Sequence, residues 1–397
     1  MPNKPSNISV IIPTLNGGDT FRDCLSMIAS QKYAGAVELI IIDSGSTDGT
    51  LKAAKDFGAH TISISQADFH HSRTRNHALI AASYPQVVFS VQDAIPASDT
   101  WLQTLSNTLE SQEVVAASGA QLPHSGAELY AKFEVDFHRE YLGSALQTFT
   151  LDSSSEGHES YDKLLRKIRI DNVAAIYRTE IIKNNPFPEV QYGEDMAWAY
   201  SILKKGYKIA YNPAAAVYHS HNRSPDYRFR RALVDAMMRA KILSRVRRDL
   251  SFVSFNQYQD VYENVLHLSE EISGYYLESL IKNTLQNRVL RKIIQAGHSL
   301  GKTRLRHIVE MSMHTDRFPD RWHEHYIMHY KRLIHYILVL VIQRYKGVTA
   351  SELLRFAGHF AHTTLGRLLG DIYGGKLLKG IPALEFAPFI NENLTGV

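Results

Sequence analysis

Polar side chains stand just past three predicted strands in the first hundred residues. Thr14 and Asn16 follow the first strand, Asp43 ends the second, and Asp93 follows the fourth. Open parallel sheets bind ligands beyond the carboxyl ends of their strands, so we expect these side chains to share one site. For each aspartate taken alone, a role in a turn or a helix cap is the alternative.

Two glycine-rich runs differ in what they predict. The run Asp43-Ser-Gly-Ser-Thr-Asp-Gly-Thr50 lies between a predicted strand and a predicted helix. Its exposed backbone N–H groups and helix N-terminus suit a nucleotide, although it is not a Gly-x-Gly-x-x-Gly fingerprint. The run Gly297-His-Ser-Leu-Gly-Lys-Thr303 resembles a phosphate-binding P-loop. It is one residue too short and follows helical sequence, so we do not assign it a phosphate.

Charged and imidazole side chains gather at two predicted helix starts and after one predicted strand. Arg75 lies in a basic helix start that suits an anion, with a solvated helix end as the alternative. Glu194 and Asp195 open a helix, where negative charge also complements the helix dipole. His219 and His221 follow a strand, a spacing otherwise typical of the protein surface.

Alternating strand and helix patterns must position these groups. The alternation predicts an α/β fold with a mostly parallel, doubly wound sheet. The predicted strands are 8–13, 37–43, 61–64, 87–91, 114–117 and 208–211, and the predicted helices are 19–31, 50–57, 72–82 and 195–205.

Later segments predict a polar loop and a helical region. Residues 153–158 are small and polar and predict a mobile loop. Helix-forming residues dominate from Pro225 onward, which divides the chain into 1–224 and a helical region over 225–397. Residues 326–345 interleave basic with aliphatic side chains. Core packing is the first expectation there, and an interfacial membrane helix or an oligomer contact are the alternatives.

Composition restricts the class of protein. The 397 residues are 44% hydrophobic and 21% charged, which is typical of a soluble globular protein. A net charge of +4 is too small to predict nucleic-acid binding. The single cysteine, Cys24, excludes an internal disulfide and a cysteine metal cluster. The apolar run at 333–342 is about half as long as a membrane span needs. We expect a cytoplasmic protein, and this location is compatible with contact at the inner face of the cell membrane.

Six motifs resemble, in order, those of the inverting family-2 glycosyltransferases, and together they span residues 8–223. This resemblance implies a GT-A fold. Three further segments are similar to bacterial rhamnosyltransferases. The six motifs are Pro13-Thr-Leu-Asn16, Asp43-Ser-Gly-Ser-Thr-Asp48, Thr74-Arg-Asn76, Gln92-Asp-Ala94, Gly193-Glu-Asp195 and Val217-Tyr-His219; the three segments are 69–76, 118–123 and 219–222.

The resemblance implies a donor site and a metal site. Val91-Gln-Asp93 stands in place of the Asp-x-Asp motif of the family, so its first aspartate is missing. Asp93 is the implied ligand of Mg²⁺ or Mn²⁺, with His219 preferred to His221 as the second ligand. The nucleotide-sugar site is implied for Pro13, Thr14, Asn16, Asp43, Ser44, Arg75, Gln92 and Asp93.

The resemblance also implies the chemistry. Asp195 is the implied general base, and Glu194 beside it contacts acceptor or donor. The expected reaction moves L-rhamnose from dTDP-rhamnose to a polysaccharide or lipid-linked saccharide, as in lipopolysaccharide biosynthesis. A transferase that uses a UDP-sugar is one alternative. A catalytically degenerate scaffold is the other, supported only by the incomplete Asp-x-Asp motif.

Overall fold

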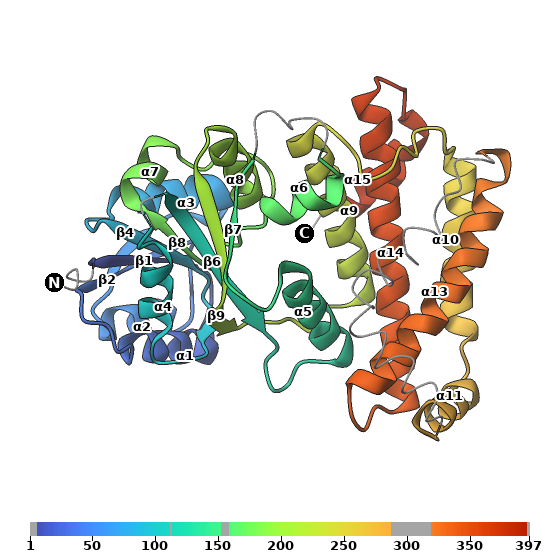
Figure 1. The fold of residues 1–397 in the computed structure, drawn as a ribbon, viewed down its shortest axis with the longest axis horizontal. Helices are drawn as coiled ribbons and strands as arrows, with labels where there is room; N and C mark the ends of the chain where they lie inside the picture. The colour runs from blue at the N-terminus through green and yellow to red at the C-terminus, as the bar shows by residue number, and fades with distance from the viewer. Residues whose placement is uncertain (1–5, 112, 152–158, 287–318, 395–397) are drawn as a thin grey trace. The chain divides into compact units, whose positions relative to one another are not determined.

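The computed structural model describes residues 6–111, 113–151, 159–286 and 319–394, and the chain divides into two compact units (Figure 1). The first unit is Met1–Ala127 with Glu134–His221, and the second is Glu128–Phe133 with Asn222–Val397. The predicted loop at 153–158 and the glycine-rich run at 297–303 lie outside the described residues.

The first unit is built on one mixed sheet. Its strand order is β3-β2-β1-β4-β8-β6-β9-β5, and β7 pairs with β9. The strands are β1 (Ile8–Thr14), β2 (Val37–Asp43), β3 (His60–Ser63), β4 (Gln86–Ser90), β5 (Ile95–Pro96), β6 (Val114–Leu122), β7 (Gln147–Phe149), β8 (Ala174–Arg178) and β9 (Lys208–Tyr218).

The strand directions confirm the parallel part of the predicted sheet and add antiparallel strands. Strands β1 to β4 pair in parallel, as do β6 and β9. The short strand β8 runs antiparallel between β4 and β6, and β5 and β7 run antiparallel to β9. The sequence analysis did not predict these three short strands, because each is too brief to show a clear period.

Strands β6 and β9 extend well beyond their predicted ends and bring two functional segments together. A bulge interrupts their register between Gly119 and Gln121. A Cβ atom at Gly119 would lie 1.7 Å from the carbonyl oxygen of Ala215, so only glycine fits this close approach. The register then resumes with Gln121 opposite Val217, which places Gln121 beside the end of β9.

Helices cover both faces of this sheet (Figure 1). Helices α1, α2 and α4 cover one face, where Phe21, Ala53 and Trp101 join a core with the strands. Helices α3, α7 and α8 cover the other face. The helices are α1 (Gly18–Ala29), α2 (Thr50–Asp56), η1 (Gln66–Asp68), α3 (His71–Ile80), α4 (Trp101–Thr108), α5 (Leu129–Leu142), α6 (Tyr161–Lys167), α7 (Thr179–Asn184) and α8 (Glu194–Lys204).

The second unit is helical, as predicted for the region after Pro225. Helices α9 and α14 approach so closely that a Cβ atom at Gly366 would lie 2.1 Å from the carbonyl oxygen of Phe229. The elements are α9 (Pro225–Leu243), α10 (Phe255–Glu271), α11 (Gly274–Gln286), η3 (Pro319–Arg321), α13 (Trp322–Arg344), α14 (Ala350–Leu378), η4 (Leu384–Phe386) and α15 (Ala387–Leu394).

The apolar stretch at 326–345 lies in α13, and its aliphatic side chains pack in the core of the second unit. Leu333, Ile337 and Val341 are almost completely buried there. Core packing, the first expectation for this stretch, is therefore confirmed. Within the described residues, we find no helix with the length and apolar character that crossing a membrane requires.

Candidate functional site

The carboxyl ends of β1 and β2 are tied together by polar side chains. Pro13 and Thr14 end β1, and Thr14 lies opposite Asp43, the last residue of β2. The hydroxyl of Thr14 donates a 3.1 Å hydrogen bond to the buried carboxylate of Asp43. The backbone N–H and the hydroxyl of Ser44 both donate to the carbonyl of Thr14. These bonds fix the edge of the sheet from which the following loops extend.

Asp43 organises the loop that follows it. Its Oδ2 accepts from the backbone N–H groups of Gly45 and Ser46 at 3.0 and 2.9 Å, and its Oδ1 accepts from the Ser46 hydroxyl. With the bond from Thr14, all four lone-pair positions of the carboxylate are occupied. This arrangement supports the turn-stabilising alternative for Asp43. The place of Asp43 in the nucleotide-sugar site stays a prediction, and a hydrogen bond from the nucleotide to its carboxylate requires one of these bonds to be exchanged.

The loops after β1, β2 and β4 are also joined to one another. Asn16 adopts a left-handed conformation, with φ of 48°, and its side-chain oxygen accepts from the backbone N–H of Thr47. The side-chain amide of Gln92 donates to the carbonyl of Leu15 and accepts from the Leu15 N–H. Gln92 therefore holds the first loop beside Asp93. This role needs both a donor and an acceptor, which an amide provides and a carboxylate does not.

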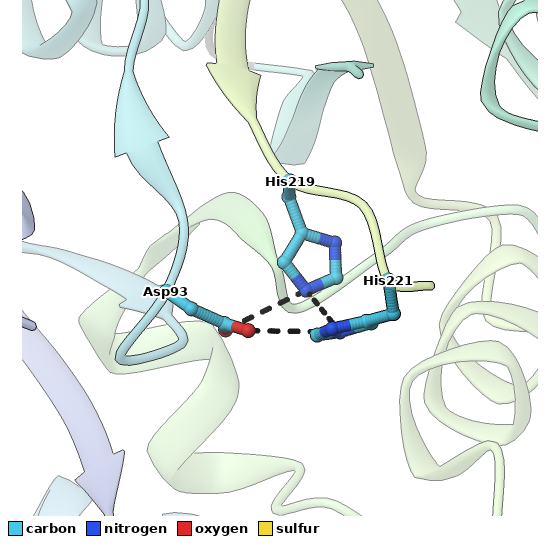
Figure 2. A group of neighbouring side chains, drawn as sticks. All are labelled: Asp93, His219 and His221. Atoms are coloured by element: carbon cyan, nitrogen blue, oxygen red, sulfur yellow. Dashed lines mark hydrogen bonds and ion pairs between the residues drawn. The ribbon is translucent and has the colours of Figure 1, made fainter. Parts of the chain in front are cut away.

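Asp93, His219 and His221 converge on one point, with their ligand atoms all within 4.8 Å of one another (Figure 2). The Nε2 atoms of the two histidines are 3.1 Å apart, and each lies 3.6 Å from an oxygen of Asp93. Two ligands of one ion at 2.0–2.2 Å are separated by roughly 3.0–3.5 Å. One carboxylate with two imidazoles therefore fits a divalent cation, and the structure offers both histidines as ligands.

A chain of hydrogen bonds from Gln121 sets the tautomer of His219. The side-chain N–H₂ of Gln121 donates to Asp171, which as a carboxylate can only accept. The Oε1 of Gln121 therefore faces the Nδ1 of His219, at 2.8 Å, and that nitrogen carries the hydrogen. The lone pair of His219 is left on Nε2, the atom that faces Asp93. Such outer contacts orient metal-binding histidines.

Gln121→Leu is expected to weaken Mn²⁺ binding in the presence of nucleotide by about 10–100-fold, because His219 loses the bond that fixes its tautomer. Isothermal titration calorimetry measures the affinity directly. Gln103→Leu, at an exposed amide pair on α4, is the matched control and should bind Mn²⁺ like the parent. Unchanged affinity in Gln121→Leu would show that His219 does not depend on this contact.

Glu194 is held in a buried ion pair at the start of α8. Its Oε1 accepts from Arg75 at 2.9 Å and from the side-chain amide of Asn172 at 3.1 Å. Burial raises the pKa of Glu194, but the positive charges of Arg75 and His71 outweigh this effect, and its pKa lies below the usual value. Both side chains of the pair are less than a tenth exposed. Removing one partner of such a pair costs about 3–5 kcal/mol.

Asp195 has the opposite electrostatic environment. Its Oδ2 accepts from the backbone N–H of Asn172, and its Oδ1 accepts from that of Met196. Burial raises the pKa of Asp195, and the negative charges of Glu194 and Asp171 raise it further, to about 8. The two neighbouring carboxyls thus differ in protonation near neutral pH. A pKa near the working pH is what general acid–base catalysis requires.

The structure brings together residues that the sequence analysis had separated or missed. Gln121, Asp171 and Asn172 connect the His219 site with the Glu194–Asp195 pair. Gln121 lies within one of the rhamnosyltransferase-like segments, which was the signal available in the sequence. Asp171 and Asn172 belong to no motif that we recognised.

Comparisons with known proteins identify the family to which the chain is similar. The model of glycosyl transferase family 2 matches residues 9–168. The chain is 35% identical over 229 residues to the O-antigen chain rhamnosyltransferase WbaN of Salmonella anatum, across 57% of this chain and 70% of that protein. It is 33% identical over 228 residues to the O-antigen chain rhamnosyltransferase RfbN of Salmonella typhimurium, across 56% of this chain and 69% of that protein.

Among solved structures, a mannosyltransferase from Pyrobaculum calidifontis, in complex with GDP-Man and Mn²⁺, matches with a TM-score of 0.45 and 20% identity. This match covers 60% of the present chain and 65% of that one. The identity to WbaN, over more than two thirds of its length, settles the family. The chain belongs to glycosyltransferase family 2, and its first unit is a GT-A domain.

Proposed function

We propose that this glycosyltransferase moves L-rhamnose from dTDP-β-L-rhamnose to a hydroxyl of a polysaccharide or lipid-linked saccharide. The observation that carries the proposal is the cluster of Asp93, His219 and His221 and its connection, through Gln121 and the neighbouring residues Asp171 and Asn172, to Asp195. This arrangement pairs a cation site with a site for proton transfer. The likeness to two O-antigen rhamnosyltransferases supports the choice of sugar.

The proposed mechanism assigns separate residues to cation binding, proton transfer and nucleotide binding. Asp93, His219 and His221 hold Mg²⁺ or Mn²⁺, which when bound stabilises the negative charge on the leaving diphosphate. Asp195 accepts the proton of the acceptor hydroxyl as the oxygen of that hydroxyl attacks the anomeric carbon of the donor sugar. The loops that carry Asn16 and Ser44 line the pocket for the nucleotide. A single displacement on a β-linked donor yields an α-L-rhamnoside.

We propose a positioning role for Arg75. The resemblance implied that it lies near the nucleotide, and this stays a prediction. In the structure, its guanidinium contacts Glu194 and the carbonyl of His71, and its side chain is 6% exposed. The buried pair fixes the start of α8, and Asp195 is the second residue of that helix. Arg75 therefore acts through Glu194 on the orientation of the base.

The donor is tested by a panel of nucleotide sugars supplied with an extracted lipid-linked acceptor. Nucleotide release and transfer should be about tenfold or more faster with dTDP-rhamnose than with UDP-glucose, UDP-galactose or UDP-N-acetylglucosamine. Rhamnose lacks a 6-hydroxyl, and a pocket without a partner for that hydroxyl disfavours sugars that carry it. The segment that includes Leu122 and Pro123 is the candidate for this pocket.

The panel also separates the alternatives. A preference for a UDP-sugar would exclude rhamnose and leave the glycosyltransferase family unchanged. A chain that binds nucleotide sugars but turns over none of them, with Mg²⁺ or with Mn²⁺, would be a scaffold. We further propose that a lipid-linked acceptor is met at the inner face of the cell membrane.

A further inference from the structure

Large apolar side chains are exposed where α14 ends. Leu377 and Leu378 lie in the last turn of this helix, and the chain then reverses at Gly380, whose φ is +64°. Ile381 and Leu384 follow the reversal, and Leu384 is 83% exposed. Phe252, from the loop between α9 and α10, is also exposed. A folded protein normally buries side chains of this size, so their grouping points to a binding surface.

Two chain segments, 239–252 and 367–385, form this surface, and we name them together the end patch. The ammonium of Lys379 contacts the carboxylate of Asp249. A Cβ atom at Gly375 would lie 3.6 Å from the backbone nitrogen of Ser251. The end of α14 therefore packs directly against the segment that carries Phe252, within one compact unit.

The two segments of the end patch are rich in basic side chains. Its two segments contain eight basic and three acidic side chains, a net charge of +5, whereas the whole chain carries only +4. Burial raises the pKa of Asp371 to about 6, and the positive charges of four surrounding arginines oppose this rise, so basic side chains of both segments are neighbours. The basic residues are Arg239, Lys241, Arg245, Arg247, Arg248, Arg367, Lys376 and Lys379, and all except the buried Lys376 are at least partly exposed.

We propose that the end patch docks the enzyme on an anionic lipid surface. Exposed leucines and isoleucine beside basic side chains match a surface of acyl chains beneath anionic headgroups. This docking is a contact with the membrane surface, because no described helix is long and apolar enough to cross a membrane. The apolar stretch of α13 is excluded from this role by its burial in the core. The inference rests on the proposed function in one respect, that a lipid-linked acceptor is found at a membrane.

The test is sedimentation of the full chain with phosphatidylcholine vesicles, with and without phosphatidylglycerol. Binding should require phosphatidylglycerol and weaken as salt rises, because salt screens surface charge. Leu377→Ser with Leu384→Ser, and separately Arg247→Glu with Arg248→Glu, should each lower the vesicle partition coefficient about tenfold or more. The leucine variant keeps every charge and the arginine variant keeps every apolar side chain, so each tests one component.

Matched control variants change exposed side chains of the same kinds elsewhere in the helical unit. Lys331→Glu with Arg332→Glu and Met328→Ser with Leu354→Ser should bind vesicles like the parent. Circular dichroism melting shows that all variants are folded, and nucleotide release without membranes is measured separately. A patch variant that loses vesicle binding but still releases nucleotide supports the proposal, whatever the donor sugar.

Three outcomes would overturn the proposal. The parent could bind neutral and anionic vesicles equally, or the end-patch variants could bind as well as the parent. Sedimentation velocity could instead show a dimer of the parent that Leu377→Ser with Leu384→Ser dissociates, which would assign the end patch to a second copy of this chain.

Discussion

Replacing Asp195 with asparagine is expected to lower the rate of sugar transfer about 10²–10⁴-fold, the contribution of a well-placed general base. The amide has nearly the same shape and retains an oxygen to accept hydrogen bonds, but it cannot take a proton from the acceptor. Affinity for the donor nucleotide should remain almost unchanged, because the base acts on the acceptor. Steady-state kinetics together with calorimetric nucleotide binding measure both quantities.

The pH dependence gives a second readout of the same assignment. The pKa of Asp195 is raised to about 8, so the base is protonated below that pH and transfer should increase as pH rises through it. This acidic limb should be absent from the Asp195→Asn variant. Glu180→Gln is the control for a helix-dipole effect, because Glu180 is likewise the second residue of its helix and is exposed. Activity of Asp195→Asn within tenfold of the parent would remove Asp195 from this role.

Asp93→Asn is expected to lower metal-dependent turnover about 10²-fold or more, since the only carboxylate of the Asp93–His219–His221 cluster is lost. EDTA should stop turnover of the parent, and added Mn²⁺ or Mg²⁺ should restore it. Without nucleotide the cation should bind weakly, because phosphate oxygens complete the ligand set of such ions. Calorimetry with Mn²⁺, with and without nucleotide, measures this difference.

Histidine variants decide which imidazole is a ligand. If both bind the cation, His219→Ala and His221→Ala should each weaken Mn²⁺ binding in the presence of nucleotide. His60→Ala, at an exposed position on β3, should not. Full activity of the parent in EDTA, or parent-like Mn²⁺ affinity of Asp93→Asn, would contradict the metal assignment.

The sequence by itself determined the local features of the site. Period-two and helical patterns located β1 to β4 and the helices between them to within a few residues, because these signals depend only on near neighbours along the chain. The same signals showed that Asp43 ends one strand and that Asp93 follows another. A parallel sheet then required these residues to share an edge, which the pairing of Thr14 with Asp43 illustrates.

Contacts between distant segments were decided only by the tertiary structure. Gln121 and His219 are far apart in the sequence, and they meet because β6 and β9 pair with a bulge beside Gly119. The sequence analysis did not predict that Arg75 pairs with Glu194, a contact that forms because α3 and the start of α8 meet in the fold. Contacts between residues so far apart in the sequence cannot be predicted from patterns among near neighbours.

Exposure was also decided by packing. For the aliphatic run of α13, the sequence predicted core packing but left an interfacial membrane helix as an alternative, and the structure shows that the run packs in the core of the helical unit. Leu377 and Leu384 had no distinguishing pattern, yet they are exposed, one in the last turn of α14 and the other just after that helix. Hydrophobicity is a property of each side chain, whereas burial depends on which other elements the fold brings against it.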